Sequence, residues 1–192
     1  VSHEEGGFLG SIAKAEELSK EDGVYLPGQF SNPDNVAAHT TITGPETLEQ
    51  LKVFGRVPDH VIAGVGTGGT IMGLAHAFKA VNPSCQAHPL EPLNSPTLST
   101  GYKTGAHKIA GISDEFVPSI CKLDELDSIV SVDDIDSIIM AQRLSRELGL
   151  GVGISSGANF IGAVMALRDS DPSGCAVTVF ADDNKKYLST DY

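Results

Sequence analysis

The spacing of hydrophobic residues changes repeatedly along the chain. Residues 61–65 form a continuous apolar run, which is typical of a buried strand, whereas the apolar residues of 69–81 recur with the spacing of one helix face. Further strands are predicted at residues 24–26, 86–92, 129–132 and 176–180. Further helices are predicted at residues 6–20, 46–53 and 158–168, and from Ser131 to Leu148.

This alternation of strands and helices determines the predicted fold class. It predicts an α/β fold of three layers, in which a mostly parallel sheet carries helices on both faces. Ligands of such sheets bind beside the carboxyl ends of the strands. The glycine-rich loop at 64–70 and the segment 181–190 both follow predicted strands, so we expect both at that edge of the sheet.

Serine side chains at two places are predicted to cap helices. Ser131 precedes two aspartates, and acidic residues suit the first turn of a helix. Either Ser155 or Ser156 is predicted to cap the helix that follows, because the sequence around them does not match the G-x-S-x-G motif of a nucleophile.

The stretch at residues 94–118 has no clear periodicity. It is rich in Gly, Ser, Thr and Pro, and a segment of this length without a regular element is either functional or disordered. Apolar residues are interleaved along it, which predicts that it packs against the rest of the protein. These residues are Leu98, Tyr102, Ile109, Ile112 and Phe116.

Charge and cysteine content exclude several classes of protein. The formal net charge is -12, and an acidic surface repels nucleic-acid backbones and anionic lipid. No apolar run approaches the length of a membrane-spanning helix. The three scattered cysteines fit reduced thiols, which predicts a cytoplasmic protein. None of the six histidines has a partner at metal-ligand spacing, so no metal site is predicted.

The glycine-rich loop is the first candidate for chemistry. Gly64, Gly66 and Gly69 match G-x-G-x-x-G between a strand and a helix, and Glu91 follows at the distance of the acid that binds a ribose. These features alone would indicate a nicotinamide-dependent oxidoreductase. However, Thr67 and Thr70 add hydroxyl donors, which suit the three free oxygens of a phosphate monoester. A glycine turn that only packs is also open.

The second candidate is the pair Asp182 and Asp183. Two carboxylates at the end of a strand could transfer protons, bind a metal or cap the next turn. The residues themselves leave these three alternatives open.

A series of motifs now identifies a family. In chain order they are Q-F-S-N-P at 29–33, T-G-P-E at 43–46, G-V-G-T-G-G-T at 64–70, E-P at 91–92 with S-P at 95–96, H-K-I at 107–109 with G-I at 111–112, G-I-S-S-G at 153–157 and Y-L-S-T at 187–190. The chain closely resembles the cysteine synthase (O-acetylserine sulfhydrylase) and cystathionine β-synthase family of pyridoxal-phosphate enzymes of fold type II. The resemblance covers essentially all 192 residues.

The resemblance implies a site for pyridoxal 5'-phosphate (PLP). It implies that the cofactor phosphate lies on Gly66, Thr67, Gly68, Gly69 and Thr70, and that Gln29, Gly111 and Ile112 border the substrate. Alignment through Y-L-S-T puts Asp183 where the family usually has a serine at the pyridine nitrogen. We therefore expect Asp183 to contact that nitrogen, with Asn184 or a water as the alternative.

The resemblance also implies a reaction and a division of the chain. The reaction is a β-replacement that forms cysteine from O-acetylserine and sulfide, or the condensation of a serine derivative with homocysteine, in an enzyme that is commonly a homodimer. Residues 1–40 would belong to the smaller domain and a crossover, and 41–192 to the large domain that binds the phosphate.

The family's Schiff-base lysine has no counterpart in this sequence. In the family that lysine lies upstream of the part that this chain resembles, and Lys14, Lys79, Lys103 and Lys108 do not match its position. We therefore expect no catalytic lysine in this chain, and no covalent attachment of the cofactor by the chain alone. A non-catalytic fragment that only binds or assembles is the alternative hypothesis.

Overall fold

Parallel strands form the centre of the molecule. A computed structural model describes residues 6–113, 115–190 and 192, and within them β1 (His60–Gly64), β2 (Gln86–Pro92), β3 (Val130–Val132) and β4 (Ala176–Thr178) make one sheet. The strand order is β3-β2-β1-β4, and every neighbouring pair is parallel. The predicted parallel α/β sheet is confirmed.

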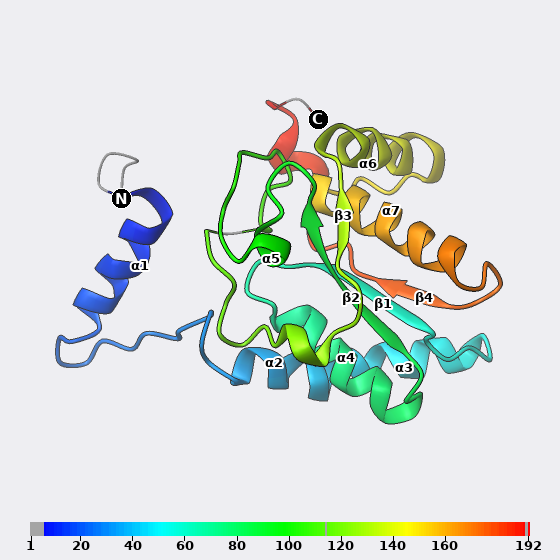
Figure 1. The fold of residues 1–192 in the computed structure, drawn as a ribbon, viewed down its shortest axis with the longest axis horizontal. Coiled ribbons are helices and arrows are strands. Elements are labelled where there is room, and N and C mark those ends of the chain that lie inside the picture. Colours follow the sequence, from blue (N-terminus) through cyan, green and yellow to red (C-terminus); the bar gives the residue numbers. More distant parts are fainter. Residues whose placement is uncertain (1–5, 114, 191) are drawn as a thin grey trace.

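Helices cover both faces of this sheet (Figure 1). On one face lie α4 (Gly69–Val81) and a helical run made of α2 (Asp34–Ala38), the π-helix η1 (His39–Thr43) and α3 (Gly44–Val53). On the other face lie α6 (Asp134–Leu148) and α7 (Ile154–Asp169). Three short helical turns, α5 (Thr97–Thr100), η2 (Leu123–Glu125) and η3 (Asn184–Tyr187), belong to the connecting segments.

The core is divided by the sheet into two hydrophobic clusters. Successive strand residues point to opposite faces, so Val61 packs with Phe78 of α4, whereas Ile62 packs with Ala158 of α7. Burial on both sides explains why β1 reads as a continuous apolar run. At Gly162 an added Cβ would lie 2.9 Å from Ile62 Cγ2, so α7 can approach the sheet this closely only with glycine there.

Helix α1 (Gly7–Leu18) lies apart from the layered body (Figure 1). The predicted helix is confirmed, but none of its residues is buried, although its sequence is amphipathic. It is linked to the body through aromatic rings: Phe8 packs edge-on against Phe30 at 5.6 Å, and Phe30 against Phe116 at 5.3 Å. The predicted strand at 24–26 is wrong, because these residues are exposed and have no neighbouring strand to pair with.

Three local predictions are corrected. The helix predicted at 46–53 begins much earlier, because α2 and η1 run into α3 without interruption. Ser131 lies on β3 and donates to Glu91, whereas Asp133 caps α6 by accepting from the backbone N–H of Ile135 at 2.8 Å. The residue before α7 is Gly153, so neither Ser155 nor Ser156 caps it; both lie in its first turn.

The segment at 94–118 is packed, as its interleaved apolar residues predict. Leu98, Ile109 and Ile112 are buried, and Tyr102 pairs with Phe116 in an isolated bridge. Tyr102 itself is exposed, and Asp114 lies outside the described residues. The predicted boundary at residue 40 falls within the run from α2 to α3, which packs against α4; the division into domains stays a prediction.

Candidate functional site

The glycine-rich loop joins the carboxyl end of β1 to the start of α4. Gly68 precedes the helix with φ 87, a left-handed conformation that glycine adopts without strain. An added Cβ on Gly66 would lie 2.6 Å from the carbonyl oxygen of Gly111, so the loop and the segment carrying Gly111 approach too closely for any side chain. The N-terminus of α4 and its helix dipole favour an anion here.

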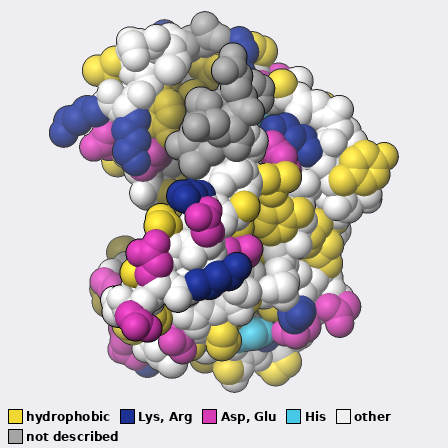
Figure 2. All heavy atoms as spheres, turned by 90° about the vertical axis from the view of Figure 1, so that its left-hand side faces the viewer, with side chains coloured by type: hydrophobic (Ala, Val, Ile, Leu, Met, Phe, Trp, Pro, Cys, Tyr) yellow, Lys and Arg dark blue, Asp and Glu magenta, His cyan; other side chains and the backbone are white. Residues whose placement is uncertain are grey.

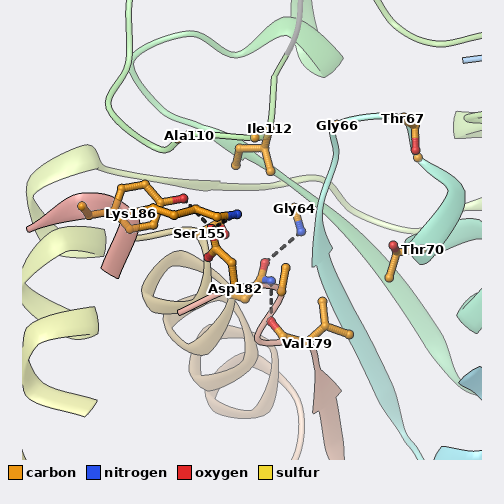
Figure 3. A pocket seen from close by; sticks show the side chains of 15 residues that line it. Gly64, Gly66, Thr67, Thr70, Ala110, Ile112, Ser155, Val179, Asp182 and Lys186 are labelled. Atoms are coloured by element: carbon orange, nitrogen blue, oxygen red, sulfur yellow. Dashed lines mark hydrogen bonds and ion pairs between the residues drawn. The ribbon is translucent and has the colours of Figure 1, made fainter. Parts of the chain in front are cut away.

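A cavity of ≈ 540 Å³ opens in front of this loop (Figure 3). Thr67 and Thr70 border it on the side of α4, and Ala110 and Ile112 border it from the segment above. The opposite wall carries Ser155, Asp182, Lys186 and Tyr187, from the start of α7 and the segment after β4. The expected position at the carboxyl edge of the sheet is confirmed for both the loop and this segment.

Asn159 of α7 joins the two sides of the cavity. Its Oδ1 accepts from the backbone N–H of Gly64 at 2.8 Å, and its Nδ2 donates to the carbonyl oxygen of Val179 at 2.8 Å (Figure 3). The side chain is 2% exposed, so both bonds are shielded from water. This residue therefore fixes the end of β1 relative to the segment that follows β4.

Both threonines of the loop are held from behind by the helical run at 34–43. Asn35 Nδ2 donates to Thr67 Oγ1 at 3.0 Å, and His39 Nε2 lies 3.3 Å from Thr70 Oγ1. Burial lowers the pKa of His39 and so favours the neutral form of its ring. Neither Asn35 nor His39 borders the cavity, but both contact residues that do.

Glu91 does not act as a ribose acid. It is 1% exposed, and its carboxylate accepts from the backbone N–H of Leu98 at 2.8 Å and from the hydroxyls of Ser99 and Ser131. These groups occupy both carboxylate oxygens inside the protein. The alternative of a nicotinamide site, which rested on the glycine motif and on Glu91, therefore loses its ribose-binding acid.

The two aspartates after β4 differ in their surroundings. Asp183 is exposed and accepts from the backbone N–H of Lys185 at 2.9 Å, so it caps η3, one of the three predicted alternatives. Asp182 borders the cavity and accepts from the Tyr187 hydroxyl at 2.7 Å. Burial and this hydrogen bond raise the pKa of Tyr187 to about 12. Lys186 Nζ lies 3.6 Å from the Asp182 carboxylate.

The structure brings together most of the predicted site. The loop residues Gly66, Thr67, Gly68 and Thr70 and the facing residues Gly111 and Ile112 all line the cavity, with Gly69 beginning α4 behind them. Gln29 and Asp183 are not on the cavity wall; Gln29 is exposed, and its carbonyl oxygen accepts from Asn35 Nδ2 at 2.8 Å.

Several residues of the site were not predicted. Asn159 and Ser155 are polar positions four residues apart on α7, a spacing that puts them on one face and could have identified them. No sequence pattern marks Asn35, His39 or Lys186 as site residues, because their positions near the loop depend on how segments distant in the chain pack together.

Neither a metal-binding cluster nor a membrane-spanning helix occurs among the described residues. They contain no group of three or more His, Cys, Asp or Glu that could hold a metal ion, and His3 lies outside them. No helix among them is both long and apolar enough to cross a bilayer. Acidic and basic side chains are interspersed with apolar ones on the face seen in Figure 2.

Sequence similarity relates this site to known proteins. The model of a family described as pyridoxal-phosphate dependent enzyme matches residues 1–182. The cysteine synthase of Staphylococcus aureus is 38% identical over 181 residues, which are 94% of this chain and 57% of that protein. The chain therefore spans little more than half the length of this curated relative.

Solved structures resemble the whole chain. A hydrogen sulfide-producing enzyme from Fusobacterium nucleatum is 56% identical with a TM-score of 0.95, over 100% of this chain and 57% of that one. An O-acetylserine dependent cystathionine beta-synthase from Helicobacter pylori is 34% identical with a TM-score of 0.89, over 99% of this chain and 60% of that one.

Proposed function

The chain belongs to the family of pyridoxal-phosphate dependent enzymes, and from this we propose that its cavity binds PLP with the phosphate on residues 66–70. We further propose that the protein forms cysteine from O-acetylserine and sulfide by β-replacement. The observation that carries the proposal is the loop between β1 and α4, whose threonine hydroxyls and helix N-terminus line one side of the cavity.

The residues present fit a phosphate monoester. The loop has no room for a side chain at two of its glycines, which leaves its backbone open to a ligand. An added Cβ would collide with the Gly111 carbonyl at Gly66, and at Gly68 it would lie 2.6 Å from Cys121 Cβ. The backbone N–H groups and the hydroxyls of Thr67 and Thr70 supply donors, and the start of α4 adds partial positive charge. The fit supports PLP over a ligand without a terminal phosphate.

The remaining cavity residues would hold the rest of the cofactor and the substrate. When bound, PLP supplies an electron sink that makes the groups on the α and β carbons of an amino acid labile. Gly111 and Ile112 form part of the cavity wall next to the loop, which supports their predicted place beside the substrate. The predicted roles of Gln29 at the substrate and of Asp183 at the ring nitrogen stay proposals.

A second candidate function is release of sulfide from a thiol amino acid. The 56% identity to the hydrogen sulfide-producing enzyme of Fusobacterium nucleatum, against 38% to the cysteine synthase, is the observation that supports this second candidate. The two reactions share the β carbon as the place where sulfur is attached or removed, so the same site suits both. Condensation of a serine derivative with homocysteine and a non-catalytic fragment are the remaining alternatives; a homodimer in the cytoplasm stays a prediction.

The first test measures binding of the cofactor by this chain. We expect PLP, but not NAD, to bind with its phosphate at residues 66–70, measured by equilibrium dialysis and located by the structure of the complex. We also expect no covalent attachment to a lysine of this chain after borohydride reduction. A phosphate located elsewhere, or binding of NAD at this loop, would contradict the proposal.

The second test separates the candidate reactions. This chain and the longest protein in which it occurs are each given PLP with either O-acetylserine and sulfide or cysteine alone. Cysteine synthesis supports the first function, and sulfide release from cysteine supports the second. If the longest protein binds PLP but performs neither reaction, nor the homocysteine condensation, the non-catalytic alternative stands.

A further inference from the structure

Asn35 and His39 lie four residues apart on the run formed by α2 and η1, which puts them on one face. This face packs directly against α4 where α4 has glycines, also four residues apart. An added Cβ on Gly69 would lie 2.0 Å from Asn35 Oδ1, and one on Gly73 would lie 2.4 Å from His39 Cβ. The two glycines therefore allow these polar side chains to reach the start of α4.

The hydrogen bonds of Thr67 leave its proton for the cavity. Its Oγ1 accepts from Asn35 Nδ2 at 3.0 Å and from the backbone N–H of Gly69 at 3.3 Å. A hydroxyl has two acceptor sites and one proton, so these bonds fill both acceptor sites. The hydroxyl proton can then be donated only to a group in front of the loop.

The orientation of the Asn35 amide is fixed as well. Its Nδ2 also donates to the carbonyl oxygen of Gln29 at 2.8 Å. A flip of the amide would put Oδ1 against this carbonyl oxygen and leave two acceptors facing each other. The nitrogen is therefore held toward Thr67.

His39 controls the hydroxyl of Thr70 through its tautomer. Its Nδ1 lies 3.0 Å from Thr43 Oγ1, and its Nε2 lies 3.3 Å from Thr70 Oγ1. A neutral ring has one N–H. If the Thr43 hydroxyl donates to Nδ1, then Nε2–H donates to Thr70, whose own proton is left for the cavity. In the other tautomer, Nε2 takes that proton.

The π-helix provides the geometry of this contact. The backbone N–H of Gly44 donates to the carbonyl oxygen of His39, the wide spacing of a π-turn, and such turns are frequent at functional sites. Within this turn Thr43 lies next to the His39 ring, and Gly44 lies against Ala77 of α4.

We propose that Asn35 and His39 are a positioning pair: they direct the hydroxyl protons of Thr67 and Thr70 toward the phosphate of the bound ligand without touching it. This inference rests on the proposed function, since it names residues that prepare the same phosphate site. The helical run at 34–43 would therefore contribute to ligand binding as well as covering one face of the sheet.

The first experiment is a double-mutant cycle in this chain, with the dissociation constant of PLP as the measurement. We expect Asn35→Leu and Thr67→Val each to weaken binding by about tenfold, as expected for one lost hydrogen bond to a charged group. Together they should weaken it no further than either alone, because both remove the same donor. Asn35→Ala repeats the test with a smaller side chain, and circular dichroism checks the fold of each variant.

The second experiment uses the two amide analogues of histidine. His39→Gln places an N–H donor near the position of Nε2, so it should keep the affinity for PLP within about twofold. His39→Asn places it near Nδ1 and should weaken binding by about tenfold. The matched control is Thr41→Val, on the same π-helix, whose hydroxyl donates only to the carbonyl oxygen of Ala37 and which should leave binding unchanged.

The outcomes separate this inference from the proposed function. The ³¹P resonance of bound PLP should shift in Asn35→Leu and His39→Asn but not in Thr41→Val. If the unaltered chain binds neither PLP nor inorganic phosphate, the proposed function fails, and this inference fails with it. If the unaltered chain binds PLP but the Asn35 and Thr67 losses are additive, or His39→Gln and His39→Asn behave alike, the positioning pair alone is wrong.

Discussion

The two ends of the sheet use similar side chains in opposite ways. At the amino ends of the strands, the rings of His60 and His88 stack at 5.3 Å and share a hydrogen bond of 3.1 Å. Ser170 Oγ lies 2.8 Å from His60 Nε2, and His88 Nδ1 lies 3.1 Å from the carbonyl oxygen of Ser128, so every ring nitrogen has a partner inside the protein.

At the carboxyl ends, a histidine and two threonines lie beside the cavity that we propose binds PLP. His39 and Asn35 contact Thr70 and Thr67 from behind, and the threonines face the cavity. The difference teaches that residue type does not decide between stability and binding. A polar group whose protons all go to the protein stabilises the fold, whereas one whose acceptors alone are filled keeps a donor for a ligand.

The largest effect on PLP binding should come from adding a side chain to the glycine-rich loop. In Gly66→Ala the new Cβ would lie 2.6 Å from the Gly111 carbonyl oxygen, and backbone would have to move. We expect loss of detectable PLP binding and a decrease of about 1–3 kcal/mol in the free energy of unfolding, as for other overpacked sites. Equilibrium dialysis and urea unfolding measure the two effects.

The matched control for this variant is Gly151→Ala. Its Cβ would meet only the end of the Asn184 side chain, at 3.2 Å, which can turn away. Gly151→Ala should bind PLP with the affinity of the unaltered chain. If Gly66→Ala also binds PLP with that affinity, the close approach of the loop and the cavity wall is contradicted.

A smaller effect is expected at the opposite end of the sheet. His88→Leu leaves His60 Nδ1 without its buried partner, which should lower the free energy of unfolding by about 1–3 kcal/mol. PLP affinity should stay unchanged, because this pair lies at the far end of the strands. Urea unfolding and dialysis check both statements, and a parallel loss of affinity would show that the two ends are coupled.

The same pair predicts a pH dependence of stability. Burial lowers the pKa of His88 below the ordinary value of about 6.5, so the unfolded chain binds this proton more tightly than the folded chain. The contribution of His88 is present above that ordinary value and is lost as the pH falls below it. We expect a lower free energy of unfolding at pH 5.5 than at pH 7.5.

His39 contributes to this pH dependence in the same direction, since burial lowers its pKa too. His88→Leu should therefore reduce the difference between the two pH values without abolishing it. An equal difference in the variant and the unaltered chain would exclude His88 as a source.

The smallest effect on stability is expected for Asp183→Ser. Asp183 is exposed and caps η3, and serine also caps helices, so the free energy of unfolding should change by less than about 0.5 kcal/mol. The predicted contact with the ring nitrogen requires a changed absorbance spectrum of bound PLP. An unchanged spectrum would show that Asp183 does not contact the ring nitrogen. Asp182 would then be the only one of the two aspartates at the site.

Local patterns predicted the central part of the fold well. The structure has α4 at Gly69–Val81 and β2 at Gln86–Pro92, at the predicted bounds, because glycine, proline and apolar spacing act within a few residues. The strand at 24–26 failed, because a strand needs a neighbour that three apolar residues do not reveal. Glu91 had the spacing of a ribose acid, but its hydrogen bonds to the turn at 97–100 bury it.

The sequence by itself determined the parallel α/β sheet and the place of the glycine-rich loop at its carboxyl edge, and its motifs predicted the phosphate site that we propose for this loop. These depend on neighbouring residues and on the two periodicities of strand and helix. Only the tertiary structure decided that Asn35 and His39 contact the threonines from behind, that Asn159 joins the cavity walls and that Asp182 rather than Asp183 lines the cavity. Those contacts join segments far apart in the chain, and the direction of a hydrogen-bond donor is set by what packs behind it.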